Sequence, residues 1–339
     1  MKKVRVEDAA GMVLCHDLTR IVKDGFKGAQ FRKGHIVREE DIPVLLSMGK
    51  QSIFVWEKQI GMLHEDEAAE RLANICCGEN TSCGTPVEGK IELSAVCSGV
   101  FCFDPFVLQQ INSVDSVTVA ARHAWSAVKT GEKLAGMRVI PLVIPEALIQ
   151  EAEKYAENKK LFSVKPYIKK SACIVTTGSE IAKGLIKDSF TPVLIEKLSQ
   201  FDIRVVKHII VDDSTDNIIN AIKEARSQKP DILLCTGGMS VDPDDSTPAA
   251  IKMSGAEIVS YGAPVLPGSM FLLGYYPEGC AVMGLPGCVM YHKATIFDIA
   301  LPRAAAGIKM SKNDFTALGN GGLCLSCKEC TYPVCPFGK

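Results

Sequence analysis

Apolar runs alternate with amphipathic segments along the second half of the chain. Four short and almost wholly apolar runs have the pattern of buried strands, namely residues 172–176, 203–211, 231–235 and 281–284. Two intervening segments, 192–200 and 215–227, repeat apolar residues at helical spacing. Strands that alternate with helices predict an α/β domain of three layers, a parallel sheet covered on both faces. In such sheets ligands bind beyond the carboxyl ends of the strands.

The first half of the chain has a different pattern, which is richer in short β-type runs. Residues 39–49 predict a helix, because acidic residues come first, Pro43 follows early and Gly49 closes the segment. A strand is expected at 52–56 and a helix within 61–80. The sequence therefore predicts four regions: a mixed α/β region at 1–60, a helix plus β-rich domain at 61–164, the α/β domain at 165–308, and a flexible linker with a cysteine-rich tail at 309–339.

Composition and charge narrow the class of protein. The 38 basic and 39 acidic side chains nearly balance, so neither nucleic acid nor a membrane is expected as a partner. No apolar run approaches the roughly 18 residues of a membrane span, and the first residues lack the apolar core of a signal peptide. These patterns predict a soluble, cytoplasmic protein. Its 14 cysteines are too many for ordinary core positions, and the chain is too large for a disulfide scaffold.

The segment with the most chemistry is residues 236–248, which directly follows the apolar run at 231–235. It reads Thr-Gly-Gly-Met-Ser-Val-Asp-Pro-Asp-Asp-Ser-Thr-Pro. Gly237 and Gly238 allow backbone amides to approach a phosphate closely, and the carboxylates of Asp242, Asp244 and Asp245 can hold a hard cation that neutralises it. The alternative is a tight turn between strand and helix, in which the acidic residues are solvated turn and cap residues.

Four segments follow predicted strands in this domain, namely 176–181 (Thr-Thr-Gly-Ser-Glu-Ile), 236–245, 263–269 (Ala-Pro-Val-Leu-Pro-Gly-Ser) and 284–289 (Gly-Leu-Pro-Gly-Cys-Val). In this order and spacing they resemble the molybdopterin-binding domain of molybdenum-cofactor biosynthesis proteins, and most closely its molybdopterin molybdenumtransferase, or molybdenum insertase, branch. The resemblance covers roughly residues 165–308, with a weaker similarity at 36–55. Each motif alone occurs in many proteins, whereas four of them in the same order and spacing are specific to this family.

The resemblance implies a ligand, a cation and a set of site residues. Molybdopterin, or its adenylylated form, would contact Thr177, Gly178, Ser179, Glu180, Gly237, Gly238, Met239, Ser240, Pro267, Gly268, Pro286 and Gly287. The family inserts molybdate with the help of Mg²⁺, which implies Asp242 and Asp245 as cation ligands. With Asp188, these two aspartates are the predicted catalytic residues. The family also implies a homodimer that serves a client molybdoenzyme.

This sequence departs from the family pattern at several positions. Pro243 replaces an aspartate, Ser269 replaces a lysine that could meet a phosphate, and Cys288 replaces an asparagine. Ligand binding tolerates these changes better than molybdenum insertion does, so whether the chain is an enzyme is left open. The alternatives to an insertase are a molybdopterin adenylyltransferase and a non-catalytic carrier or sensor of the finished cofactor.

A second signal is a dense set of cysteines near residue 330. The spacing Cys324-x₂-Cys327-x₂-Cys330-x₄-Cys335 suits Zn²⁺ or an iron–sulfur cluster, and the proline after the last cysteine is also found in ferredoxin runs. One alternative is a flexible tail in which the thiols stay reduced and bind nothing. Another is that the thiols relay sulfur or a metal. A further hypothesis is that the protein is an iron–sulfur redox protein whose main functional site is this cysteine segment. Residues 319–322 (Gly-Asn-Gly-Gly) predict a hinge before the segment.

Overall fold

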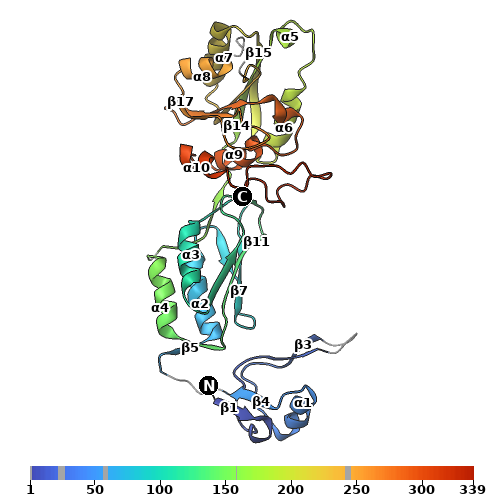
Figure 1. Cartoon of the computed structure of the whole chain (residues 1–339), viewed down its shortest axis with the longest axis vertical. Helices are drawn as coiled ribbons and strands as arrows, with labels where there is room; N and C mark the ends of the chain where they lie inside the picture. Colours follow the sequence, from blue (N-terminus) through green and yellow to red (C-terminus); the bar gives the residue numbers. More distant parts are fainter. Residues whose placement is uncertain (1, 22–26, 56–59, 158, 241–245) are drawn as a thin grey trace. The chain divides into compact units, whose positions relative to one another are not determined.

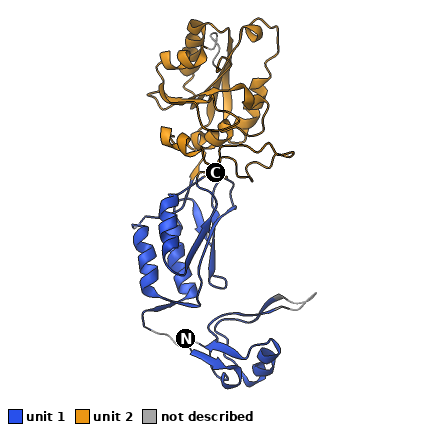
Figure 2. Cartoon of the chain, in the orientation of Figure 1, with its two compact units in different colours: residues 1–97, 101–124, 128–164 blue, residues 98–100, 125–127, 165–339 orange. Residues whose placement is uncertain are grey.

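The computed structural model describes residues 2–21, 27–55, 60–157, 159–240 and 246–339 (Figure 1). The chain divides into two compact units (Figure 2). Unit 1 comprises residues 1–97, 101–124 and 128–164, and unit 2 comprises residues 98–100, 125–127 and 165–339. The predicted regions 1–60 and 61–164 thus fall mostly in unit 1, and the predicted regions 165–308 and 309–339 fall together in unit 2.

The first part of unit 1 is built from short antiparallel pairs. Its elements are β1 (Lys2–Arg5), η1 (Val6–Asp8), β2 (Leu18–Ile21), β3 (Lys27–Phe31), η2 (Glu39–Asp41), α1 (Ile42–Ser47) and β4 (Ser52–Val55). β1 pairs with β4, and β2 pairs with β3. Leu14, Val37, Leu45 and Ile53 are among the residues of a small apolar core. The predicted helix at 39–49 is therefore present as η2 followed by α1.

The second part of unit 1 is an antiparallel sheet with helices packed on it. Its elements are β5 (Met62–His64), α2 (Glu65–Cys76), β6 (Thr81–Cys83), β7 (Lys90–Ala95), α3 (Pro105–Ser113), β9 (Val117–Ala121), β11 (Lys133–Val139), β12 (Val143–Pro145) and α4 (Glu146–Tyr155). The four-stranded sheet has the order β6-β7-β11-β9. The buried face of α2, which includes Ala68, Ala69 and Leu72, packs on β7 and β11. Three short strands, β8 (Gly99–Cys102), β10 (Ala127–Val128) and β13 (Ser163–Pro166), lie where the chain passes between the units.

Unit 2 is built on a six-stranded sheet with the order β15-β14-β16-β19-β18-β17. Its strands are β14 (Ser171–Thr177), β15 (Arg204–Val211), β16 (Ile232–Thr236), β17 (Glu257–Tyr261), β18 (Leu272–Tyr275) and β19 (Ala281–Leu285). Its helices are α5 (Ser179–Ala182), α6 (Phe190–Ser199), α7 (Thr215–Ser227), α8 (Thr247–Met253), η3 (Gly287–Met290), α9 (Ile296–Ala305) and α10 (Lys312–Ala317). Within the described ranges, no helix combines the length and apolar character needed to cross a membrane.

The sheet of unit 2 is mixed, which corrects the prediction of a parallel sheet. β15, β14, β16 and β19 are parallel to one another, whereas β18 runs antiparallel to β19 and β17 runs antiparallel to β18. The cause is a tight reversal between β18 and β19. In this reversal the Gly279 amide donates to the Tyr276 carbonyl at 2.8 Å, and Gly279 has a φ of +89°. A connection this short joins only antiparallel strands, since a parallel pair needs a longer crossover.

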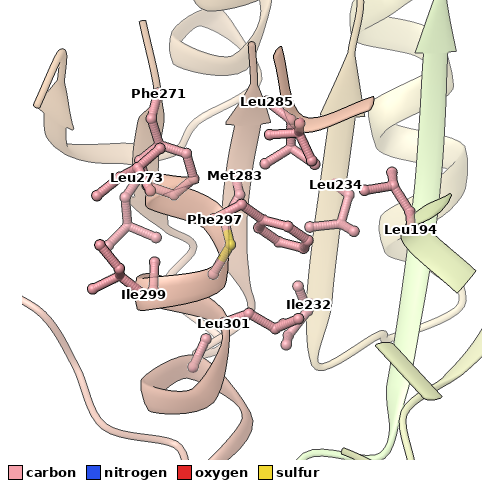
Figure 3. Close-up of a cluster of buried hydrophobic side chains, with 14 of the residues drawn as sticks. Leu194, Ile232, Leu234, Phe271, Leu273, Met283, Leu285, Phe297, Ile299 and Leu301 are labelled. Carbon is pink, nitrogen blue, oxygen red and sulfur yellow. The ribbon is translucent and has the colours of Figure 1, made fainter. Parts of the chain in front are cut away.

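Both faces of this sheet are buried against helices, as the sequence predicts for a three-layer α/β domain. Successive residues of a strand point to opposite faces. Ile232, Leu234 and Met283 face a core with α6 and α9, in which Phe297 lies at the centre of the labelled side chains (Figure 3). Leu233 and Cys235 face a second core with α7 and α8. This arrangement explains why the central strands read as continuous apolar runs.

Residues 309–339 are packed onto the core of unit 2, which differs from the predicted flexible tail. Met310, Phe315 and Phe337 are buried in the same core as Phe297. A Cβ on Gly321 would lie 2.3 Å from the Lys339 carbonyl oxygen, and one on Gly322 would lie 2.3 Å from the Pro264 carbonyl oxygen. The glycines of the predicted hinge therefore allow close packing of backbone on backbone.

Asp231 joins the beginnings of neighbouring strands in unit 2. Its carboxylate accepts hydrogen bonds from the backbone amides of Lys170 and Ser171 at 2.9 and 3.1 Å and from the Ser171 hydroxyl at 2.9 Å. Lys169 Nζ lies 3.3 Å from Asp231 Oδ1. Burial by itself raises the pKa of Asp231, but these donors outweigh burial and hold the pKa below its usual range.

We expect Asp231→Asn to destabilise unit 2 above pH 4 and much less below it. A carboxylate with a depressed pKa stabilises the folded state above its unfolded pKa of about 3.9, and the contribution is lost as the pH falls through the lower folded pKa. The loss at pH 7 should be about 1–3 kcal/mol. Hydrogen exchange of the β14 and β16 amides measures this loss of stability. Asp202→Asn is the control, because the Asp202 side chain is 90% exposed. Equal protection in both variants at pH 7 would contradict the assignment.

Candidate functional site

A pocket of about 540 Å³ lies at the end of the unit 2 sheet where β16 and β19 finish. Its described lining comes from three loops, residues 237–240, 268–270 and 285–288, together with Phe190 at the start of α6. Small-molecule sites commonly have volumes of about 300–1,000 Å³. Three of the four loops that the sequence predicts around a ligand therefore meet in one pocket of suitable size.

The lining of this pocket is neutral. Its apolar side chains are Phe190, Met239, Met270, Leu285 and Pro286. Ser240 and Ser269 add hydroxyl groups, and burial is the main cause that raises the pKa of the Cys288 thiol. Charged side chains are missing from the part of the lining that the structure describes. Backbone amides and hydroxyls would therefore hold an anion here, and the apolar side chains suit a flat ring.

Gly237 brings the loop after β16 close to the end of β14. It has a φ of +85°, and a Cβ at this position would lie 2.2 Å from the Thr177 carbonyl oxygen and 2.6 Å from Thr177 Oγ1. No side chain fits at that distance from a backbone atom. Gly238 also has a positive φ, of +54°. The first glycine of the Thr-Gly-Gly motif is thus required by the contact between two adjacent strand ends.

Met239 anchors the same loop in the core. It is 4% exposed and belongs to the core beneath α7 and α8. A Cβ on Gly284 would lie 2.5 Å from Met239 Cε, so the glycine in β19 makes the space for this side chain. The Tyr261 hydroxyl donates to the Met239 carbonyl at 3.2 Å. Met239 therefore fixes the position of Gly238 and Ser240 at the pocket.

The first predicted loop, 177–180, lies beside the pocket and contributes nothing to its described lining. Thr177 is buried, and its hydroxyl lies 3.3 Å from the Thr247 hydroxyl. Gly178 has a φ of +148°, and Glu180 is exposed. The Ser179 amide donates to Asp213 Oδ2 at 2.8 Å. The carboxylate of Asp213 therefore lies where the sequence places an anionic ligand.

Asp188 lies at the start of α6. Its Oδ1 accepts hydrogen bonds from the amides of Phe190 and Thr191 at 2.8 and 3.1 Å, and His208 Nε2 lies 3.4 Å from Oδ2. Burial alone would raise the pKa of Asp188, but the bonds from Thr191 and Phe190 and the nearby His208 lower it below its usual range. These contacts make Asp188 a helix cap, and the described lining of the pocket does not include it.

The third predicted loop contributes Gly268, whereas Pro267 lies outside the described lining. A Cβ on Gly268 would lie 2.5 Å from Ile296 Cγ2, and Gly268 has a φ of +122°. The Ile296 amide donates to the Pro267 carbonyl at 3.4 Å. The beginning of α9 is thus packed directly against this loop, and Ser269 and Met270 form the wall of the pocket.

Sequence reasoning missed a buried network of threonines below the pocket. Thr236 Oγ1 donates to Thr176 Oγ1 at 3.3 Å. Thr176 Oγ1 in turn lies 3.0 Å from His208 Nε2, and Thr191 Oγ1 lies 3.1 Å from the same nitrogen. The sequence contains a hint of this network, because Thr176 and Thr236 stand at the ends of two apolar runs. His208 therefore has polar partners in this network, although the residue itself is exposed.

The predicted cation ligands Asp242 and Asp245, with the neighbouring Asp244, lie outside the described residues. Among the residues that are described, no three His, Cys, Asp or Glu side chains are grouped to hold a metal ion. Asp212, which follows β15, accepts hydrogen bonds from the Ser214 amide and from Asn217 Nδ2 at 3.1 and 2.9 Å.

The fold and the pocket define a ligand-binding α/β domain, and comparison with known proteins gives its family. Residues 173–306 match the family described as "probable molybdopterin binding domain", and residues 3–57 match a domain of unknown function. Unit 2 therefore contains a domain of the molybdopterin-binding family, in a divergent form. This finding confirms the family to which the sequence motifs point.

Two curated relatives are similar to part of the chain. A CinA-like protein of Pseudothermotoga lettingae is 34% identical over 85 residues, which are 25% of this chain and 21% of the relative. A putative competence-damage inducible protein of Bacillus cereus is 34% identical over 96 residues, which are 28% of this chain and 23% of the relative. The chain thus spans less than a quarter of the length of these two relatives.

Two solved structures are each similar to more than a third of the chain. The molybdopterin biosynthesis enzyme MoaB from Thermus thermophilus is 19% identical, with 39% of this chain and 90% of that chain covered and a TM-score of 0.35. CinA from Thermoplasma acidophilum, a protein of unknown function, is 20% identical to this chain and has a TM-score of 0.29. The similarity covers 35% of this chain and 89% of that chain.

We expect Gly237→Ala to destabilise unit 2 by about 2–4 kcal/mol, because the new methyl group collides with the Thr177 backbone in a left-handed conformation. Gly287→Ala is the matched control. Nothing lies within 4 Å of a Cβ at Gly287, and the change should stay within about 0.5 kcal/mol of wild type. Hydrogen exchange of the β14 and β16 amides reports both effects. Equal protection in the two variants would show that the contact between Gly237 and Thr177 is not a constraint.

Proposed function

We propose that this protein binds molybdopterin, or its adenylylated form, in the pocket formed by the loops 237–240, 268–270 and 285–288. The observation that carries the proposal is that the motif loops of a molybdopterin-binding domain converge on one pocket of about 540 Å³. The side chains of Met270 and Pro286, which line the pocket, would contact the flat pterin. The amides at Gly237 and Gly238, with the Ser240 hydroxyl, would hold the terminal phosphate.

On this proposal the protein acts in molybdenum cofactor biosynthesis, and the chemical step is insertion of molybdate into the bound pterin. Asp242 and Asp245 would hold a Mg²⁺ ion that neutralises the phosphate groups. The residues that the structure describes would bind and orient the substrate, since none of the lining side chains is charged. The family match over residues 173–306 agrees with a role in cofactor assembly.

A second candidate is a non-catalytic carrier or sensor of the cofactor. Two observations favour it. The wall of the pocket has Ser269 where the insertase pattern has a lysine, and the Ser179 amide is occupied by Asp213 at 2.8 Å. Both features reduce the positive potential available to a transferring phosphate. An adenylyltransferase would use the same pocket and remains a third candidate. The family pattern implies that each of these three candidates would act as a homodimer.

We expect Gly287→Leu to weaken binding of the pterin by about tenfold or more, which corresponds to roughly 1.4 kcal/mol. A leucine side chain at this open position of the lining takes up space that the ligand would fill. Anaerobic purification from a host that makes molybdopterin, followed by oxidation and fluorescence quantification of the bound pterin, measures the effect. Gly84→Leu is the control, because its nearest neighbour to a Cβ is 3.9 Å away in unit 1. Equal pterin in both variants would place the ligand elsewhere.

We expect Asp245→Ala to abolish Mg²⁺-dependent turnover and to leave the fold intact, because its proposed role is to hold the ion. The assay supplies adenylylated molybdopterin, molybdate and Mg²⁺ and measures released AMP. Release that requires molybdate supports the insertase. Formation of the adenylylated pterin from ATP without molybdate supports the adenylyltransferase, and tight binding without turnover supports the carrier. Unchanged turnover in Asp245→Ala would refute the cation assignment.

A further inference from the structure

A second pocket in unit 2, of about 250 Å³, collects the four cysteines that are dense in the sequence. Cys324, Cys327, Cys330 and Cys335 all line it. The remaining lining is Tyr291, His292, Lys293, Ala294, Leu323, Leu325, Ser326, Thr331, Tyr332, Pro336 and Phe337. The fold thus brings thiols that are spread over twelve positions of the sequence around one cavity.

The segment that carries these thiols is held in place at both ends. The Cys324 amide donates to the Leu266 carbonyl at 2.8 Å, and the Tyr332 hydroxyl donates to the Asp298 carbonyl at 3.0 Å. Phe337 is buried in the main core, and the Gly338 amide donates to the Gly321 carbonyl at 3.0 Å. Because the segment is fixed, the cavity between its thiols belongs to the fold.

The exposure of the thiols indicates a ligand. Cys327 and Cys330 are exposed, whereas Cys324 and Cys335 are half-buried and pack against the core. Two of the four thiols are therefore open to solvent, and two are partly covered by the core. A cysteine without a ligand is usually buried as a small apolar residue, since an exposed thiol is open to oxidation. Soft thiolates are the ligands that iron–sulfur clusters and Zn²⁺ prefer.

The arrangement distinguishes a cluster from a single ion. A tetrahedral Zn²⁺ site requires four sulfurs at about 2.3 Å from one point. Thiols that surround a cavity suit a polynuclear group that fills the space between them. The run of three cysteines at intervals of three residues is also the spacing of cluster-binding ferredoxins.

We propose that Cys324, Cys327, Cys330 and Cys335 ligate one 4Fe–4S cluster in this cavity. Each thiol loses its proton on ligation, so the four sulfurs bind the cluster as thiolates. The site is separate from the pterin pocket and does not depend on the function proposed for that pocket. It gives the chain an oxygen-sensitive cofactor of its own.

The experiment is anaerobic reconstitution of the full chain with sulfide and equal amounts of ferrous and ferric iron, so that the cluster forms in its oxidised 2+ state. We expect about four iron and four acid-labile sulfide per chain, with a broad visible absorption that bleaches when dithionite is added. Zinc bound at one per chain without iron would overturn the proposal in favour of a single ion. Failure to retain any metal after desalting would also overturn it.

Substitutions locate the cluster. Cys327→Ser and Cys330→Ser should each retain at least about tenfold less iron than wild type, as expected when a thiolate ligand is lost. Both residues are exposed, so these changes leave the core intact. Cys97→Ser is the control, since Cys97 is a half-buried thiol in unit 1. Circular dichroism verifies that all three variants are folded. Equal iron in Cys327→Ser and Cys97→Ser would show that the iron is adventitious and would refute the site.

Discussion

Burial of both faces of the unit 2 sheet is the constraint on which the rest of this unit depends. β14, β16 and β19 lie in the interior of the sheet, and almost all of their residues are buried. A side chain on either face packs into one of two cores, so polar chemistry has no place along these strands. It is confined to the loops at the strand ends. Because β14, β16 and β19 are parallel, their final residues lie at the same edge, and the loops that follow them are brought together there.

The sequence predicts the four parallel strands of this unit and misses the two antiparallel strands, β17 and β18. The apolar runs at 231–235 and 281–284 correspond to β16 and β19 because two cores leave no polar position in them. β17 has a half-exposed pattern with Glu257 and Tyr261 on its open side, which gives no clear period. Residues 309–339 are predicted to be flexible because glycine and polar residues dominate there. Their attachment depends on three widely spaced side chains, Met310, Phe315 and Phe337, whose partners lie far away in the sequence.

The candidate site was predictable as a set of loops, but the roles of individual residues were not. Gly237 is predicted to approach a ligand, and the structure shows that its lack of a side chain is first required by the Thr177 backbone. Ser179 is predicted as an anion donor, yet its amide is used by Asp213, which is 34 residues away. Local sequence identifies donors and acceptors. It does not tell which acceptor reaches a given amide, because that depends on the register of β14 against β15.

The two pockets of unit 2 share a short stretch of chain, residues 286–294. Pro286 to Cys288 line the pocket at the ends of β16 and β19, and Tyr291 to Ala294 line the pocket of the four cysteines. The amides of Tyr291 and His292 both donate to the Cys288 carbonyl, at 3.1 and 3.0 Å, so η3 and the residues after it form one compact turn. One hydrogen-bonded turn thus contributes lining residues to both pockets, so that the chain between them is only two residues long.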